Sequence, residues 1–146
     1  MVKKISELFV VGLQEALFET HGKMALALNR IAGRAMLDYL KEHDMLEASG
    51  HSTESLANDI QDIIDTLDSV EDVEVEEDGN EVRVRIIGCP FSKAKQTLLK
   101  RDKTPVVCPF ASCILKITEE TFEQRMRMKE INVDEDQCEF VMEKLE

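Results

Sequence analysis

The feature that most constrains this chain is a tripeptide, Cys-Pro-Phe, that occurs twice about twenty residues apart. It stands at 89–91 and at 108–110, in a sequence of 146 residues that has only four cysteines. Proline fixes the backbone angle that follows each of these cysteines and removes a hydrogen-bond donor, so it suits a strand end or the first turn of a helix. We therefore expect the two copies to form two walls of one pocket, which Cys138 would help to close.

The first half of the chain has the apolar spacing of helices. Apolar residues recur every three or four positions over 3–20 and over 23–43, and His21-Gly22 separates the two runs. Small residues around Gly33 would let another helix approach closely. A third helix is expected over 54–69, after a cap at Ser52 or Thr53. The apolar stripe of the second helix is expected to contain Met24, Ala27, Leu28, Ile31, Ala32, Ala35, Met36, Tyr39 and Leu40.

The second half alternates hairpins with helices. Period-two valines and isoleucines flank an Asp-Gly turn at 78–80, and a second alternating segment from Met126 to Met142 turns at 134–136. Short helices are expected over 92–101 and 106–124. This order predicts an α+β fold in which N-terminal helices pack on an antiparallel sheet built from two hairpins. The length predicts a single domain, 1–146, of a ligand-binding type.

The charge of the chain argues against some partners. The formal net charge is −12, which disfavours binding to nucleic acid or to anionic membranes. One region is basic, and we interpret it as a solvated helix face, with an anionic ligand or partner as the alternative. The basic residues of this region are Arg83, Arg85, Lys93, Lys95, Lys100, Arg101 and Lys103.

The start and the hydropathy of the sequence predict a compartment. The start is too polar for a signal peptide, and no run approaches the eighteen apolar residues of a membrane span. We expect a cytoplasmic protein in which cysteines stay reduced. The four thiols are then core residues, metal ligands or reactive groups rather than disulfides.

The cysteines are the candidate metal ligands. Four thiolates could form a tetrahedral site for zinc or, as the alternative, hold an iron–sulfur cluster. The short Cys-x2-Cys spacing of most structural zinc sites is absent, and cysteine often serves as a small apolar core residue. Core packing is the competing interpretation, above all for the last cysteine, which alternates with Phe140 and Met142. The candidate ligands are Cys89, Cys108, Cys113 and Cys138.

Catalysis has weaker support in the sequence. A thiolate of Cys108 at a helix N-terminus would have a lowered pKa. Such a nucleophile needs a nearby histidine, and the three histidines, His21, His43 and His51, all lie in the first third of the chain. Phosphate-binding glycine loops and the common hydrolase motifs are absent. We therefore predict no catalytic residue and disfavour an enzyme.

The layout resembles the 4-vinyl reductase, or hydrocarbon-binding, domain superfamily, whose relatives include thiazoline-carboxylate hydrolase-like proteins and the small subunits of the TRAPP tethering complex. The resemblance is carried by the helices over 12–40 with Gly22 and the run 29–34, by the hairpin that leads to Cys89, by the helix that contains Cys108 and Cys113, and by the strand over 135–140. It implies an α+β domain that is commonly dimeric through its N-terminal helices. It also implies a pocket between helices and sheet, with cysteines near it for a metal.

Together these observations predict a small-molecule or metal-binding, sensor-like domain with a cysteine-lined site. Its expected partners are a small-molecule ligand and a second copy bound through the N-terminal helices. Two alternatives remain open. One is a hydrolase or redox enzyme that uses the thiolate of Cys108 or Cys113, and the other is a non-catalytic dimeric interaction subunit.

Overall fold

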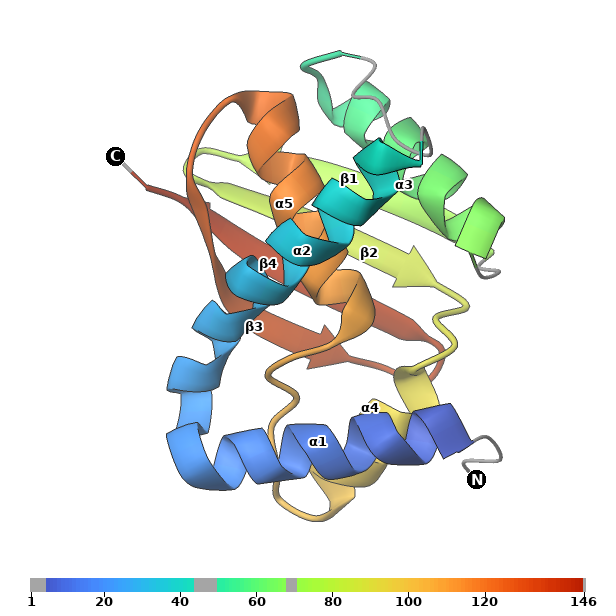
Figure 1. Ribbon diagram of the computed structural model, residues 1–146, viewed down its shortest axis with the longest axis vertical. Helices are drawn as coiled ribbons and strands as arrows, with labels where there is room; N and C mark the ends of the chain where they lie inside the picture. Colours follow the sequence, from blue (N-terminus) through green and yellow to red (C-terminus); the bar gives the residue numbers. More distant parts are fainter. Residues whose placement is uncertain (1–4, 44–49, 68–70, 146) are drawn as a thin grey trace.

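The computed structural model describes residues 5–43, 50–67 and 71–145, and it has the α+β fold that the sequence predicts (Figure 1). The chain start, the predicted connection at 46–49 and the last residues of the third predicted helix, 68–69, lie outside the described residues. The helices are α1 (Ile5–His21), the 3-10 helix η1 (Gly22–Ala27), α2 (Leu28–Glu42), α3 (Thr53–Leu67), α4 (Ser92–Lys100) and α5 (Pro109–Phe122). The strands are β1 (Asp72–Asp78), β2 (Glu81–Ile87), β3 (Met126–Val133) and β4 (Gln137–Lys144).

The four strands form one antiparallel sheet in the order β1-β2-β4-β3. Both predicted hairpins are present, and Gly79 supplies the positive φ of 57° that the first turn needs. The hairpins are joined by β2 and β4, where Val84 lies opposite Phe140 and Ile86 lies opposite Cys138. Because β2 and β4 are central, the residues at their ends are positioned by pairing on both sides.

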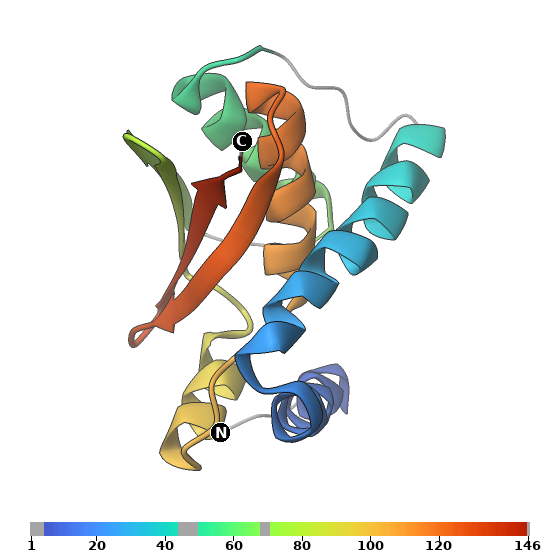
Figure 2. The same ribbon diagram turned by 90° about the vertical axis from the view of Figure 1, so that its left-hand side faces the viewer.

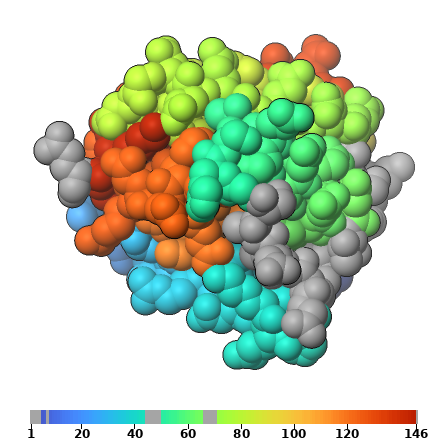
Figure 3. Space-filling view, turned by 90° about the horizontal axis from the view of Figure 1, so that it is seen from above, coloured from blue at the N-terminus to red at the C-terminus, as the bar shows by residue number. Residues whose placement is uncertain are grey.

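Helices cover one face of the sheet (Figure 2). α3 packs on β1 and α5 packs on β3, while α2 lies on the outer side of α5. Seen from above, α3 and α5 lie between the hairpin of β1 and β2 on one side and α2 on the other (Figure 3). The opposite face of the sheet is polar. There Arg85 forms ion pairs with Glu76 and Glu139, at 3.0 Å in each case.

The second predicted helix differs from its expected form in two ways. It begins as η1, and its buried side carries Asn29, Gly33 and Leu37. Five members of the predicted apolar stripe are instead exposed, namely Met24, Ala27, Ile31, Ala35 and Tyr39. The reason is the close approach of α5, which turns the small-residue side of α2 inward. A Cβ atom on Gly33 would lie only 2.0 Å from the carbonyl oxygen of Ser112, so the predicted close-packing role of this glycine is confirmed.

The first helix contacts the rest of the molecule mainly through α4 and η1. Val11 and Gln14 are buried, whereas apolar side chains on the other side of α1 face outward. The large apolar residues of α1 that the structure shows to be exposed are Ile5, Leu8, Phe9 and Leu13. Within the described ranges, no helix combines the length and the hydropathy that crossing a membrane requires.

Candidate functional site: an apolar cavity and a buried cysteine–lysine cluster

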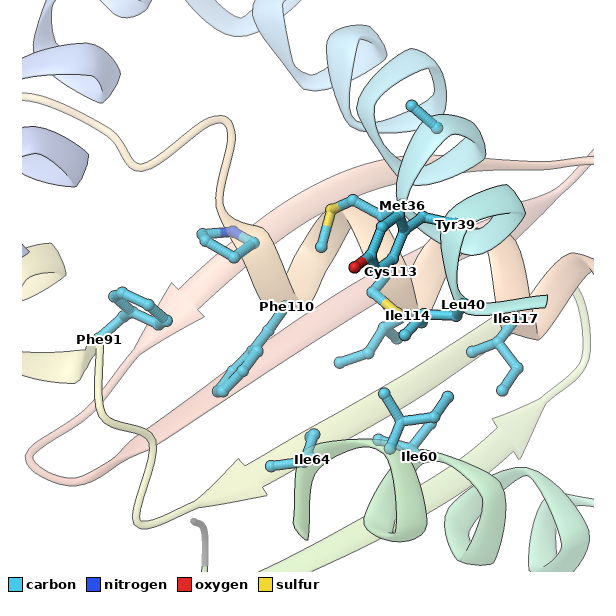
Figure 4. A pocket seen from close by; sticks show the side chains of 13 residues that line it. Met36, Tyr39, Leu40, Ile60, Ile64, Phe91, Phe110, Cys113, Ile114 and Ile117 are labelled. Carbon is cyan, nitrogen blue, oxygen red and sulfur yellow. The ribbon is translucent and has the colours of Figure 1, made fainter. Parts of the chain in front are cut away.

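An apolar cavity with a volume of about 520 Å³ lies between α2, α3 and α5 (Figure 4). Side chains from all three helices point into it, and Phe91 and Phe110 of the two Cys-Pro-Phe copies meet edge to face at its end, with ring centroids 5.4 Å apart. The lining residues are Ala35, Met36, Tyr39, Leu40, Ile60, Ile63, Ile64, Phe91, Pro109, Phe110, Cys113, Ile114 and Ile117. The prediction that the two copies wall one pocket is therefore confirmed for their phenylalanines.

The lining of this cavity is almost entirely apolar. None of the described lining side chains carries a charge at neutral pH, and the polar ones are the thiol of Cys113 and the phenol of Tyr39. Burial raises the pKa of Cys113 to about 11, so this thiol is protonated at neutral pH. An apolar cavity of this kind holds water poorly, because a buried water needs several polar partners.

One buried side chain, Asn29, positions the segment that leads into the cavity. Its Nδ2 donates to the carbonyl oxygens of Val106 and Leu26, at 2.6 Å and 3.0 Å. Its Oδ1 accepts from the backbone N–H of Cys108 and from the hydroxyl of Ser112, at 3.3 Å and 2.9 Å. This amide therefore fixes the start of α5, and with it the second Cys-Pro-Phe copy, against α2.

A second group of side chains comes together at the end of β2, outside the lining of the cavity. Gly88 adopts a positive φ of 75°, and the N–H groups of Gly88 and Cys89 both donate to the carbonyl oxygen of Asp136, at 2.8 Å and 3.1 Å. Cys138 follows two residues later on β4. The thiol of Cys89 consequently lies within hydrogen-bonding range of the sulfur of Cys138.

A lysine occupies the middle of this group. Lys95 of α4 is fully buried, and its Nζ lies 3.3 Å from the Sγ of Cys138 and 4.7 Å from the ring centroid of Phe140. The interpretation of the basic region as a solvated face is therefore wrong for this residue. Lys95 lies beside Ala94 and one turn before Leu98, which are both buried, so the inward stripe of α4 was the signal that could have found it.

The charges of the cluster stabilise one another. Burial alone would lower the pKa of Lys95, but the nearby sulfurs of Cys108, Cys138 and Cys89 outweigh it and raise that pKa. The hydrogen bond from Cys89 and the ammonium of Lys95 lower the pKa of Cys138 to about 6, against the opposing effect of burial. The same hydrogen bond, together with burial, raises the pKa of Cys89. At neutral pH the cluster is a buried thiolate–ammonium pair with a neighbouring thiol.

The remaining two cysteines have different surroundings. Cys108 is the N-cap of α5, where its Sγ accepts from the N–H of Ala111 at 3.2 Å, as a serine oxygen does in the same position. Cys113 lines the cavity instead. The structure thus gathers Cys89, Cys108 and Cys138 around Lys95 and leaves Cys113 outside the cluster, and none of the four is in a disulfide.

The four cysteines as they lie do not fit the predicted tetrahedral metal site. A positive ammonium stands among three of them, and the fourth faces the cavity. Within the described part of the chain, no group of three or more histidine, cysteine, aspartate or glutamate side chains is arranged to hold a metal ion. This arrangement gives no support to ligation of a metal by all four cysteines, which stays a prediction.

The histidines have local partners. The Nδ1 of His21 lies 2.7 Å from the hydroxyl of Thr20, His43 stacks on Tyr39, and the Nδ1 of His51 lies 2.8 Å from the carbonyl oxygen of Thr121. These contacts tie each ring to its own helix end or to the end of α5. A catalytic pairing of a thiol with a histidine has no contact to support it among the described residues.

The comparisons with known proteins bear on the family. A family model described as "Putative rubredoxin C-terminal domain" matches residues 6–145. The chain belongs to this family. The range matched to the rubredoxin C-terminal domain family includes the cavity, the cluster and all four strands. A comparison with curated proteins gave no match.

Membership of this family corrects the resemblance drawn from the sequence. The assignment to the 4-vinyl reductase, or hydrocarbon-binding, superfamily is wrong, because the match is to the rubredoxin C-terminal domain family. The residues that suggested the resemblance have local structural roles. Gly22 has a φ of 58° at a helix junction, and Cys108 caps a helix. Such roles recur in unrelated folds and do not specify a superfamily.

Proposed function

We propose that this chain is a binding domain for an uncharged, apolar small molecule, which it holds in the cavity between α2, α3 and α5. The observation that carries the proposal is the pairing of a cavity volume of about 520 Å³ with a lining that has no charged side chain. Ligand pockets commonly have volumes of about 300–1,000 Å³ and predominantly apolar walls.

The lining itself supports an apolar ligand over a polar one. The walls are formed by branched aliphatic side chains of α3 and α5, while Phe91 and Phe110 close one end. The two polar groups, on Cys113 and Tyr39, are uncharged and can orient a ligand without requiring an ion. A charged ligand would lose its hydration without gaining an opposite charge, which is unfavourable.

A plug at the rim of the cavity tests the proposal. Ala35 of α2 lines the cavity and is exposed, so Ala35→Trp places an indole at the mouth without disturbing the core. We expect this variant to bind the neutral fluorescent probe N-phenyl-1-naphthylamine at least about tenfold more weakly than the parent chain does, a loss of ~1.4 kcal/mol. Fluorescence titration measures the affinity.

The matched control is Ala27→Trp, because Ala27 is also exposed but lies outside the lining. This variant should bind the probe as the parent chain does. Equal affinities for all three proteins, or no binding to any of them, would contradict the proposal, and circular dichroism checks that both variants fold.

Metal binding by the four cysteines, with zinc or an iron–sulfur cluster, is the finer prediction from the sequence. The family description, which names rubredoxin, supports it, and the ammonium of Lys95 opposes it. Metal analysis of protein that has been purified anaerobically without chelator tests it. Stoichiometric metal that is lost in Cys89→Ser and in Cys108→Ser would establish the site.

We also propose that the chain forms a homodimer through its N-terminal helices. The support is the apolar side of α1, on which Phe9 is 68% exposed and Ile5 is 86% exposed. We expect light scattering to give twice the chain mass of 16.6 kDa. Phe9→Glu should weaken the dimer by about 2 kcal/mol or more, as for a central interface residue. The control Leu99→Glu changes an exposed leucine of α4 and should leave the dimer intact. A monomeric parent chain would refute this proposal.

A further inference from the structure

The cysteine–lysine cluster has features that the proposed binding function does not use. Lys95 is completely buried, and the hydrogen-bond acceptor that the described structure gives its ammonium is the Sγ of Cys138, at 3.3 Å. A buried ammonium without an anionic partner would cost several kcal/mol. Lys95 therefore requires an anion, and the sulfur of Cys138 is in position to carry that charge.

The neighbouring thiol is placed to react with the same sulfur. Cys89 is held beside Cys138 by the two backbone hydrogen bonds to the carbonyl oxygen of Asp136, and interaction with the Cys138 side chain is the largest cause of the raised pKa of Cys89. Cys108 is engaged elsewhere, because its sulfur caps α5. The geometry thus distinguishes one pair of sulfurs from the other two.

We propose that Cys138 and Cys89 form a redox-active dithiol that hydrogen peroxide oxidises to a disulfide, with Cys138 as the nucleophile, Cys89 as the resolving thiol and the Lys95 ammonium as the proton donor. These three residues do not line the cavity. The redox proposal therefore does not depend on whether a ligand binds there. Hydrogen peroxide is a suitable oxidant because it is neutral and little larger than water.

The proposed reaction balances without a further reactant. The Cys138 thiolate attacks one oxygen of the peroxide, the O–O bond breaks, and the departing hydroxide takes a proton from Lys95 to form water. Cys138 is then a sulfenic acid and Lys95 is a neutral amine. The Cys89 sulfur displaces the sulfenic hydroxyl, which leaves as a second water with the thiol proton of Cys89. Two thiol sulfurs are oxidised, one peroxide is reduced to two waters, and the buried charges disappear together.

Oxidation of the unmodified chain is the first test. After treatment with hydrogen peroxide, we expect the intact mass to fall by two hydrogen atoms, and dithiothreitol should restore it. Peptide mapping without reduction should recover a fragment that joins Cys89 to Cys138. This measurement needs no variant, so it stands even where a substitution prevents folding.

Variants then assign the roles. Cys89→Ser and Cys138→Ser should abolish the disulfide, whereas Cys113→Ser, the matched control, should leave it unchanged. Lys95→Met should slow disulfide formation at pH 7 by at least about tenfold, because it removes the charge that keeps Cys138 as a thiolate. Its control is Lys93→Met on the exposed side of α4, which should react at the rate of the parent chain.

Several results would overturn the proposal. One is addition of oxygen to Cys138 without a disulfide. Others are a disulfide that joins Cys108 or Cys113, an equal rate in Lys95→Met, and no reaction at all. Stoichiometric metal bound through Cys138 in freshly purified protein would also overturn it, since a ligated sulfur would not be free to act as the nucleophile.

Discussion

Replacement of Gly33 by alanine is expected to lower the free energy of unfolding by about 3 kcal/mol, at the upper end of the usual range for overpacking a core. The new Cβ would lie 2.0 Å from the carbonyl oxygen of Ser112 and 2.8 Å from its carbonyl carbon. These are backbone atoms of α5, so they can yield only if the two helices separate. Chemical denaturation with urea, followed by circular dichroism, measures the change.

A glycine-to-alanine change elsewhere is the control and should have the opposite sign. Gly12 lies within α1, and a Cβ atom built on it meets nothing within 4 Å. Gly12→Ala should therefore stabilise the protein by up to about 1 kcal/mol through helix propensity alone. If Gly33→Ala left the free energy of unfolding unchanged or raised it, as Gly12→Ala should, the close contact between α2 and α5 would be incorrect.

The second large effect is expected in the pH dependence of stability. The folded pKa of Cys138 is lowered from 9.0 to about 6, so its contribution to stability is fully present above pH 9 and is lost as the pH falls through 6. Lys95 has a raised pKa, so its contribution is complete below 10.5 and does not vary in this window. Cys89 has a raised pKa and loses its contribution only above pH 9.

These pKa shifts predict that the stability of the parent chain and of Lys95→Met will depend differently on pH. From pH 6 to pH 9, the parent chain should gain stability relative to Lys95→Met by about 2 kcal/mol, which is part of the full effect because the variant keeps the hydrogen bond from Cys89. Below pH 6 the variant should be the more stable protein, because the parent then buries an ammonium without its thiolate. Urea denaturation across this range measures the difference, with Lys93→Met as the control. Parallel curves for parent and variant would exclude the thiolate–ammonium pair.

The sequence predicted most of the fold because its signals are local. Asp78-Gly79 fixes a hairpin turn, and period-two alternation fixes the strands on either side, whatever the rest of the chain does. The stripe of α2 was harder to predict, since Met24 and Ile31 look like core residues by spacing. The side of that helix which turns inward is decided by the contact of Gly33 with α5, which is not local.

The candidate sites were predicted only in part for the same reason. The repeated Cys-Pro-Phe correctly indicated that segments 89–91 and 108–110 meet, but composition could not separate sulfurs that face a cavity from sulfurs that surround Lys95. That separation depends on the rotation of α5, which directs Cys108 and Cys113 to different surroundings. Lys95 itself belongs to a basic region that the sequence predicts to be a solvated helix face, whereas a lysine is buried almost only where it has a partner. Its partner, Cys138, lies 43 residues away.

The start of α5 belongs to both sites, and this has a thermodynamic consequence. Cys108 belongs to the cluster, Pro109 and Phe110 line the cavity, and the amide of Asn29 clamps this turn in place. Any shift of the turn is therefore felt in both places. If a ligand changes the midpoint potential of the dithiol, oxidation must change the affinity for that ligand by the same free energy, because coupling between two sites is reciprocal. The occupancy of the cavity and the oxidation state of the dithiol would then depend on each other.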